Sequence, residues 1–468
     1  MDKNLRVERH QIKPSHEFYQ MCDDIAFKSK NLYNLANYHI RQVFIITSKL
    51  SEGDLIIAEQ QDYLSWINSN VDDYNNKKQV NLDKKKLKNP DKYTDKYYLP
   101  LTYFDAEHKY LGYNFLEYLL SKTDAYRALP AQTAQQVLKL LDKNWQSFFV
   151  SIKDYSTNKG KYLGIPKLPK YKKKNGRNVA IFTNQQCKIK NNCVTFPKTD
   201  TKLKTTISEG LQQIRIIPRG NIYVIEVVYD KPLHNNKVLA NDNIAGIDLG
   251  LNNFATITNN IGLKPIVING KIIKSFNQYY NKKLSYHKSI LKKQYERDWS
   301  NRLERLNRKR NNKIDDFMHK TSKFVIDYCL TNNFSTVVIG HNDGWKQEIN
   351  LGKKNNQSFV QIPYNSFIQK LTYKAEEVGI RVIATEESYT SKASFLDLDT
   401  IPVFKIGSDN TYNFSGKRIA RGLYRSANGV LINADVNGSL NICRKVFPNA
   451  FAKGIEGVGL HPVKMNVS

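Results

Sequence analysis

The sequence lacks the features of a secreted or membrane-spanning protein. It holds 5 cysteines in 468 residues, scattered and with no CxxC pair. This pattern argues against a disulfide framework and a four-cysteine zinc site, and it is typical of a reducing cytoplasm. No run of about 18 apolar residues occurs, so we expect no membrane span, and the first residues carry no apolar signal core. We therefore expect a cytoplasmic protein, in the prokaryotic cytoplasm or nucleoid.

Acidic residues are scarce relative to basic ones. Lys and Arg number 72 against 43 Asp and Glu, so the formal net charge is +29. Such an excess predicts a polyanionic partner, and nucleic acid is the usual one. A surface charged only for solubility is the alternative, although acidic residues would serve solubility better. The sequence also has no GxxxxGK[ST] loop, so nothing indicates the use of ATP.

The chain is predicted to be a multidomain α+β protein. Residues 1–16 contain a pattern typical of a strand, and residues 17–150 show the helical spacing of apolar side chains, with an exposed polar loop at 72–98. Short alternating runs in residues 151–243 predict a small, barrel-like β domain. Residues 244–468 predict three strands, a helix, a strand, a helix, a strand and a helix. This is the order of an RNase H-like α/β domain, but order alone is weak evidence of function.

Two basic stretches are candidates for nucleic-acid binding. Residues 153–177 hold nine Lys/Arg, one acid and interleaved tyrosines, which suits phosphate contact and base stacking, or else a solvated loop. Residues 282–313, in a helical region expected at about 276–332, hold twelve Lys/Arg and three acids. They predict a helix that grips phosphates, or one with a solvated face. The predicted contacts are Lys167, Lys170, Lys172, Lys173, Lys174, Arg177, Lys288, Lys292, Arg302, Arg305 and Arg308.

Two aspartates are candidates for catalysis. In GIDLG, the neighbours of Asp248 face apolar layers, so Asp248 points to the other side of a strand. A buried carboxylate is costly unless it is paired, and a metal ion would neutralise it. An ordinary strand-end aspartate is the alternative. In NADVNGSLNI, Asp435 begins the last helix, where a carboxylate is also a routine helix cap.

Together these segments resemble a known family. GIDLG with NNFATIT, followed later by NADVNGSLNI, is similar to the first and third catalytic motifs of the TnpB (OrfB) family, which is related to the type V CRISPR effectors. LPAQTAQQVLKLLDKNWQSFF followed by GIPKLPKYKKK resembles the helical recognition region and basic junction of that family. TEESYTSK resembles its Thr-Ser signature. The resemblance covers nearly the whole chain.

The resemblance implies both a fold and an activity. A wedge β domain, made of residues 1–16 and of residues 151–243 with the basic junction, would be split around a helical recognition domain at 17–150. A RuvC nuclease domain would follow at 244–468. The implied activity is RNA-guided cleavage of double-stranded DNA with two Mg²⁺ ions, using a guide RNA from the transposon end. A nuclease-dead RNA-guided repressor and a transposase acting directly on transposon ends remain alternatives, and no feature indicates the oligomeric state.

The chain departs from the family at the middle carboxylate. The family usually places a glutamate at the end of the fourth nuclease strand, where this chain has Gly340. Some relatives carry it three residues before the Thr of the Thr-Ser signature, and Glu387 stands three residues before Thr390. Neighbouring strands lie about 5 Å apart, so a glutamate could reach the same metal ions from either strand. Glu386 is the alternative, and an inactive site remains open. The expected catalytic residues and Mg²⁺ ligands are Asp248, Glu387 and Asp435.

A second departure concerns zinc. The family usually inserts a four-cysteine zinc ribbon, which corresponds to residues of about 391–432 in this chain. Two of the cysteine positions hold Ala393 and Ser415, and no cysteine lies in the insertion. We therefore expect no zinc there. The insertion is expected to be held by the packing of Phe395, Leu396, Tyr412 and Phe414.

Overall fold

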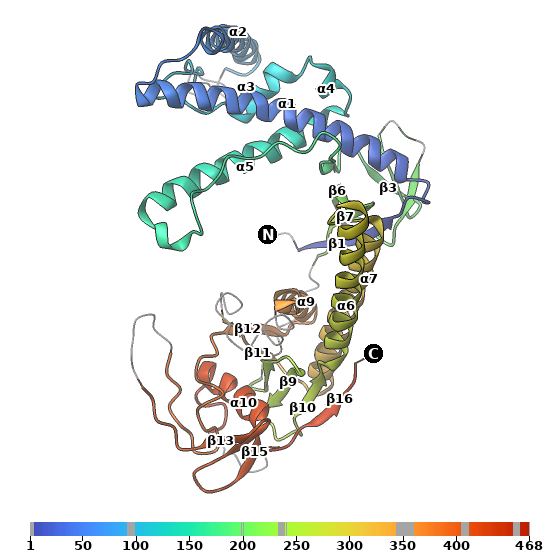
Figure 1. Cartoon of the computed structure of the whole chain (residues 1–468), viewed down its shortest axis with the longest axis vertical. Helices are drawn as coiled ribbons and strands as arrows, with labels where there is room; N and C mark the ends of the chain where they lie inside the picture. Colours follow the sequence, from blue (N-terminus) through green and yellow to red (C-terminus); the bar gives the residue numbers. More distant parts are fainter. Residues whose placement is uncertain are drawn as a thin grey trace. The chain divides into compact units, whose positions relative to one another are not determined.

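The computed structural model divides the chain into two compact units, Met1–Pro232 and Leu233–Ser468 (Figure 1). Among the residues it describes, no helix has the length and apolar character needed to cross a bilayer. The described residues are 4–90, 99–197, 199, 201–232, 239, 241–342, 360–403, 411–452 and 459–467.

Helices dominate the first unit, as the sequence predicted. The described helices are α1 (Tyr19–Glu52), α2 (Ala58–Lys88), α3 (Tyr113–Leu120), α4 (Asp124–Arg127), α5 (Ala131–Thr157) and the 3-10 helix η2 (Lys159–Lys161). They bury one core around Trp145, which is fully buried and donates from its indole nitrogen to Asn37 Oδ1 at 2.9 Å. The loop predicted at 72–98 is wrong over its first part, because α2 continues to Lys88.

Two β-sheets complete the first unit. The larger runs β1 (Leu5–Ile12), β7 (Ile222–Asp230), β6 (Leu211–Arg219) and β2 (Ala180–Thr183), all antiparallel. The smaller is made of β3 (Lys188–Lys190), β4 (Cys193–Thr195) and β5 (Lys202–Lys204). The described strands thus form two sheets in place of the barrel-like arrangement that the sequence predicted. Phe18, Cys22 and Ala26 of the first helical segment share a core with both sheets.

The second unit is built on a mixed sheet. Its order is β12 (Arg381–Thr385), β11 (Thr336–Gly340), β8 (Ile244–Leu249), β9 (Asn253–Asn259), β10 (Ile266–Asn269) and β16 (Val463–Met465). β8, β11 and β12 are parallel, whereas β9 is antiparallel to both of its neighbours. A small sheet of β13 (Lys417–Ala420), β14 (Leu423–Arg425) and β15 (Leu431–Asn433) follows β12 in the chain.

Helices cover both faces of the mixed sheet. Ala245, Ile247 and Leu249 of β8 share a core with α7 (Asn301–Thr331) and α9 (Tyr364–Glu377). Ile244 of β8 packs instead with α10 (Ala434–Val446). Because side chains alternate along a strand, Asp248 is directed to the α10 side. Two apolar layers therefore hold β8 and fix the direction of its single carboxylate.

The basic helical region predicted at 276–332 is interrupted. It forms α6 (Lys271–Tyr295) and α7, separated by Glu296 in a left-handed conformation with φ of 49°. Ser300 then caps α7, because its side chain accepts a hydrogen bond from the backbone N–H of Leu303. Two helices thus stand where the sequence indicated one helical region.

Candidate active site

Asp248 lies on the central strand β8, beneath the first turns of α10. A β-carbon added to Gly438 would stand 3.1 Å from Asp248 Oδ2, so the helix backbone passes close to the carboxylate. Burial, followed by the negative charges of Glu387 and Asp435, raises the pKa of Asp248 well above its usual value. The positive charge of Arg418, on β13, acts in the opposite direction. The fold therefore brings the three predicted carboxylates into one electrostatic environment.

Glu387 follows the end of β12 and is held by its backbone. Its N–H donates to Asn342 Oδ1 at 2.9 Å, and its carbonyl accepts from Thr390 Oγ1 at 2.8 Å. A β-carbon added to Gly340 would lie 2.6 Å from Glu387 Oε2, so the side chain uses the space left by the glycine at the end of β11. Burial, and then the charge of Glu386, raises the pKa of Glu387 to about 7.

Glu386 has different neighbours. Its carboxylate accepts hydrogen bonds from Lys445 Nζ of α10 and, at 2.5 Å, from the backbone N–H of Ser388. Burial raises the pKa of Glu386, but these hydrogen bonds outweigh burial, and the pKa lies below its usual value. The charge of Glu387 acts on Asp248, whereas Glu386 is engaged by a lysine.

Asp435 lies in the first turn of α10 but does not cap the helix. The side chain of Asn433 is the cap, and it accepts from the N–H groups of Asp435 and Val436. Asp435 Oδ2 instead accepts from Asn253 Nδ2 of β9 at 2.6 Å. The alternative of a routine capping role is wrong for Asp435, since Asn433 performs that role.

Two residues near the carboxylates were not singled out from the sequence. Tyr364 is fully buried, donates to the carbonyl of Gly250 at 3.0 Å, and has a pKa raised by burial and then by Asp248 and Glu387. Arg418 belongs to the insertion and lies outside both motifs. Neither lies in a recognisable pattern, so only the folded arrangement identifies them.

The donor chemistry of this site fits a hard divalent cation, because Mg²⁺ prefers carboxylate oxygens. The raised pKa of Asp248 reflects burial and then the proximity of negative charges, which a cation would compensate. Within the described ranges, however, no group of three or more His, Cys, Asp or Glu side chains is arranged to hold a metal ion. The residue types therefore fit Mg²⁺, but the described side chains are not arranged as a complete set of metal ligands.

The insertion is held by packing and by two aspartates. Ala393 is fully buried, at a position where the family usually has a cysteine. Asp399 accepts from the N–H of Ser394 at 2.7 Å and from Ser415 Oγ at 2.5 Å, while Asp397 accepts from the N–H of Ala427 at 2.9 Å. The predicted packing residues make contacts as well. Phe395 packs against Phe451, and Leu396 packs against the buried cluster that contains both of them. Tyr412 and Phe414 contact Tyr389.

The basic junction of the first unit is fastened to α1 by its backbone. Asn34 exchanges two hydrogen bonds with the backbone of Lys172, and the carbonyl of Pro169 accepts from Asn37 and Arg41. The fastening uses backbone groups and therefore leaves lysine side chains outside. Those of the predicted set that lie exposed are Lys167, Lys170, Lys172, Lys173 and Lys174.

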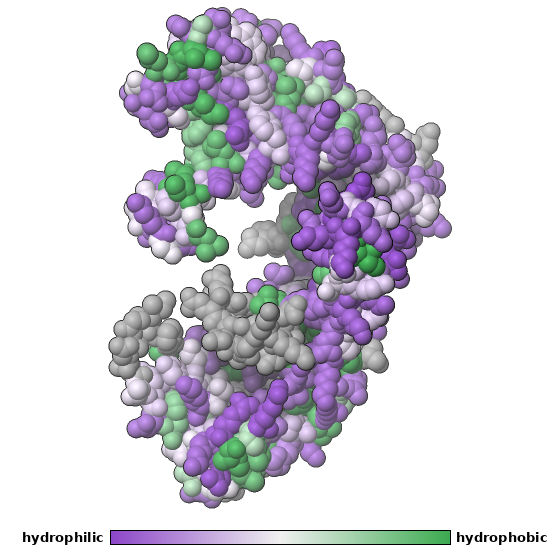
Figure 2. Space-filling model, in the orientation of Figure 1, coloured by the Kyte–Doolittle hydropathy of each residue, from purple (hydrophilic) through white to green (hydrophobic). Residues whose placement is uncertain are grey.

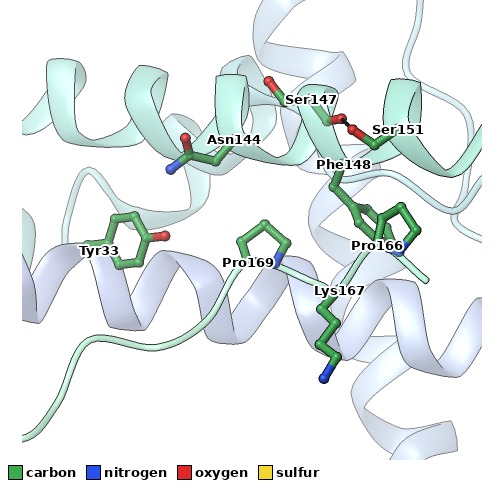
Figure 3. Close-up of a pocket in the computed structure, with 8 residues that line it drawn as sticks. All are labelled: Tyr33, Asn144, Ser147, Phe148, Ser151, Pro166, Lys167 and Pro169. Atoms are coloured by element: carbon green, nitrogen blue, oxygen red, sulfur yellow. Dashed lines mark hydrogen bonds between the residues drawn. The ribbon is translucent and has the colours of Figure 1, made fainter. Parts of the chain in front are cut away.

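A cavity of about 310 Å³ lies beside this junction. Figure 3 shows residues of α5 along one side, Tyr33 of α1, and Lys167 extending away from α5. The lining residues are Tyr33, Asn144, Ser147, Phe148, Ser151, Pro166, Lys167 and Pro169.

Arg177 differs from the junction lysines. Its guanidinium donates to both carboxylate oxygens of Asp23, at 2.9 and 2.7 Å, and its charged group lies over the ring of Phe27. Arg177 is therefore already engaged within the unit, and only part of its donor capacity is left for a ligand.

The predicted contacts on α6 and α7 are on the surface. Lys288, Lys292, Arg302 and Arg305 are exposed and Arg308 is half-buried. Figure 2 shows hydrophilic residues gathered over these helices. Lys288 Nζ lies 5.9 Å from the ring centre of Trp299, so charge and an exposed aromatic ring are adjacent here.

Comparison with known families relates this arrangement to two described groups. Residues 224–346 match the OrfB_IS605 family, described as a probable transposase, and residues 364–442 match the Cas12f1-like TNB domain. By these two matches the chain is similar to OrfB and Cas12f1-like proteins. The first match contains Asp248, and the second contains Glu387 and Asp435.

Two solved structures match this chain. One is titled "Cryo-EM structure of the Cas12f1-sgRNA-target DNA complex", with 14% identity, a TM-score of 0.30, and coverage of 93% of this chain and 98% of that chain. The other is titled "Cryo-EM structure of CRISPR-Cas12f Ternary Complex", with 14% identity, a TM-score of 0.30, and coverage of 91% and 82%. No curated protein matches the sequence.

Proposed function

We propose that the protein is an RNA-guided DNA endonuclease of the kind encoded by transposons, with a RuvC-type active site. The observation that carries the proposal is the shared electrostatic environment of Asp248, Glu387 and Asp435. Each carboxylate comes from a different element: the central strand, the end of β12 and the start of α10. The relationship to TnpB and Cas12f proteins supports the same activity.

Asp248, Glu387 and Asp435 would hold Mg²⁺ in this proposal. When bound, Mg²⁺ supplies an activated water and stabilisation of the leaving oxygen in phosphodiester hydrolysis. The other residues orient the carboxylates: Asn253 donates to Asp435, and Asn342 fixes the backbone of Glu387. Glu386 has a separate role in the proposal, because its pairing with Lys445 ties the end of β12 to α10.

The basic surfaces would hold the nucleic acids. Exposed lysines of the junction and the basic face of α6 and α7 suit the phosphates of a guide RNA from the transposon end and of target double-stranded DNA. Contacts of this kind read backbone shape, and the base pairing of the guide RNA would select the sequence.

One cleavage assay tests the proposal. The full chain, purified with its co-expressed RNA, is offered matched and unmatched DNA with Mg²⁺. We expect cleavage of matched DNA only, its loss in Asp248→Ala and Glu387→Ala, and its retention in Glu386→Ala. Cleavage that survives Asp248→Ala would rule out this site. If Glu386→Ala abolishes cleavage and Glu387→Ala retains it, Glu386 and not Glu387 is the catalytic glutamate.

Two other functions correspond to specific observations. A nuclease-dead, RNA-guided repressor is one of them, because Gly340 stands where the family usually has its middle carboxylate; it would bind matched DNA without cutting it. The description of the matched family as a probable transposase favours direct action on transposon ends, which would cut without RNA. The same assay separates both from the proposed endonuclease.

A further inference from the structure

Four aromatic residues of α1 and α2 form one contact network in the first unit, and a fifth from the basic junction adjoins it. Tyr38 and His39 come from α1, Tyr63 and Trp66 from α2, and Tyr171 from the basic junction. The ring centre of Tyr63 lies 6.2 Å from that of Tyr38 and 5.5 Å from that of Trp66, and His39 Nδ1 lies 2.8 Å from Tyr63 Oη. The guanidinium of Arg41, on the same helix as Tyr38 and His39, lies 5.2 Å from the ring centre of Tyr171, which brings the junction tyrosine beside this group. Burial, then Tyr38 and Tyr171, raises the pKa of Tyr63. We call these five residues the aromatic platform.

The aromatic platform has an inner and an outer layer. His39 and Tyr63 are the inner pair, and both carry pKa shifts caused by burial. Tyr38, Trp66 and Tyr171 are 42%, 44% and 45% exposed. A single half-exposed ring is ordinary on a protein surface. Two of these rings, Tyr38 and Trp66, contact the inner pair, and Tyr171 adjoins them; three half-exposed rings gathered in this way indicate a surface that can receive a flat ligand.

Positive charge adjoins the aromatic platform. The guanidinium of Arg41 lies 5.2 Å from the ring centre of Tyr171 and donates to the carbonyl of Pro169. Lys170 and Lys172 flank Tyr171 in the chain, and both are exposed. An apolar peptide would gain nothing from these charges, whereas a nucleic acid offers bases to the rings and phosphates to the lysines.

We propose that the aromatic platform stacks an unpaired base of RNA, while Lys170 and Lys172 contact the flanking phosphates. RNA is favoured because its recognition centres on unpaired bases in loops and ends, which stack on aromatic rings and on the planes of arginine side chains. The inference rests on the proposed function, since a guide RNA is part of it, and it assigns a contact that is independent of base pairing.

The test uses the full chain freed of nucleic acid, titrated with a fluorescent oligouridylate of about 20 nucleotides, longer than one stacking site requires. Trp66→Ala and Tyr171→Ala should each weaken binding about tenfold, because one stacked base is lost. The salt dependence should stay unchanged, since no phosphate contact is removed. Trp66→Phe and Tyr171→Phe keep a ring and should restore most of the binding.

Two controls separate stacking from charge and from folding. Tyr103→Ala removes another exposed tyrosine of the same unit, one whose hydroxyl donates to Asp72, and it should bind like the wild type. Lys170→Ala should weaken binding of both oligouridylate and inorganic polyphosphate and should lower the salt dependence. The Trp66→Ala and Tyr171→Ala variants should bind polyphosphate like the wild type.

Several results would overturn the inference. These are unchanged oligouridylate affinity in Trp66→Ala and Tyr171→Ala, an equal loss for polyphosphate, or a larger loss for oligothymidylate than for oligouridylate. In each of these cases guide-dependent cleavage by the wild type would leave the proposed function standing. If the wild type binds neither oligonucleotide, the inference and the proposed RNA partner both fail.

Discussion

The carboxylate of Glu387 occupies the space in which a side chain on Gly340 would begin. A β-carbon on Gly340 would stand 2.6 Å from Glu387 Oε2 and also 2.6 Å from Ile442 Cδ1. Glu387 reaches this space from beyond the end of β12, since Gly340 pairs with Thr385, two residues before Glu387. The end of β11 can therefore hold either its own side chain or that of Glu387, which supports the proposal that Glu387 supplies the middle carboxylate.

Gly340→Ala should disable cleavage by displacing Glu387. The added methyl group cannot be accommodated unless the ends of the Glu387 and Ile442 side chains move, and such a move takes the Glu387 carboxylate out of its present position. We expect at least a tenfold loss of guided cleavage, with RNA affinity unchanged. Gly112→Ala is the matched control, because its nearest neighbour, Tyr110, would lie 3.8 Å from the new β-carbon. Full cleavage by Gly340→Ala would show that Glu387 is not needed in its present position.

The insertion should be independent of zinc and dependent on Asp399. Asp399→Ala leaves donors of Ser394 and Ser415 without their carboxylate partner, and hydrogen bonds to charged groups contribute about 1.5–3 kcal/mol each when buried. Amide hydrogen exchange at Ser394 and Ser415 should become faster, whereas Asp327→Ala, at an exposed carboxylate, should leave it unchanged. A zinc chelator should not alter thermal unfolding of the wild type, and a fall in the midpoint would contradict this prediction.

Arg177 and Lys173 should give opposite results although both are basic residues of the junction. Arg177→Ala removes the ion pair with Asp23 and should lower stability by about 1 kcal/mol or less, since the pair is partly exposed. Lys173→Ala should leave stability unchanged and reduce the salt slope of RNA binding by about 0.7, the value of one phosphate contact on a single strand. Thermal unfolding and binding at several salt concentrations measure the two effects, and identical salt slopes would refute the distinction.

The Arg177–Asp23 pair also predicts a pH dependence. The hydrogen bond from Arg177, opposed by burial, lowers the pKa of Asp23, so the folded state binds a proton less readily than the unfolded chain. The contribution of the pair is complete above the unfolded pKa of about 4 and is lost as the pH falls through the lower folded pKa. The stabilities of wild type and Arg177→Ala should therefore converge in acid, and a difference that persists there would count against the pair.

His39 should make the first unit sensitive to mild acid. Burial lowers the pKa of His39 to about 4, against about 6.5 in an unfolded chain. The unfolded state then binds more protons in this range, so stability is complete above pH of about 6.5 and falls until about 4. The free energy of unfolding falls between these pH values, and we expect His39→Gln to make this fall smaller by about 1–3 kcal/mol. Urea unfolding at several pH values measures it, and parallel curves for the two proteins would show that His39 does not titrate there.

Some elements could be predicted from the sequence and others could not, for physical reasons. A strand was predicted within residues 1–16, where β1 lies, and the last helix was predicted to begin at Asp435, one residue after the start of α10. The second half of α2, from residue 72 to Lys88, was missed because its long polar stretch buries little. Only Ile67, Val71, Tyr74 and Leu82 are buried among its described residues, so the tertiary contacts of a few side chains hold a sequence that is polar on nearly every face.

At the candidate site, the sequence could not decide which glutamate supplies the middle carboxylate. β12 ends at Thr385, so strand alternation does not extend to Glu386 and Glu387 and could not decide which glutamate faces Asp248. The decisive groups are Lys445, distant in the chain, and the space at Gly340, and neither forms a local pattern. The C-terminal strand β16 was missed for a similar reason, because three residues beside β10 carry too little periodicity to predict a strand.

The pairing of the first strand sets the order of events during synthesis. Leu5 of β1 pairs with Asp230 of β7, and all eight residues of β1 have their partners in β7. During synthesis, β1 therefore leaves the ribosome long before β7 and has no pairing partner while the described helices of its own unit are made. A growing chain exposes such an unpaired edge to other chains, which favours a chaperone or an early nucleic-acid partner that protects it until residue 230 emerges.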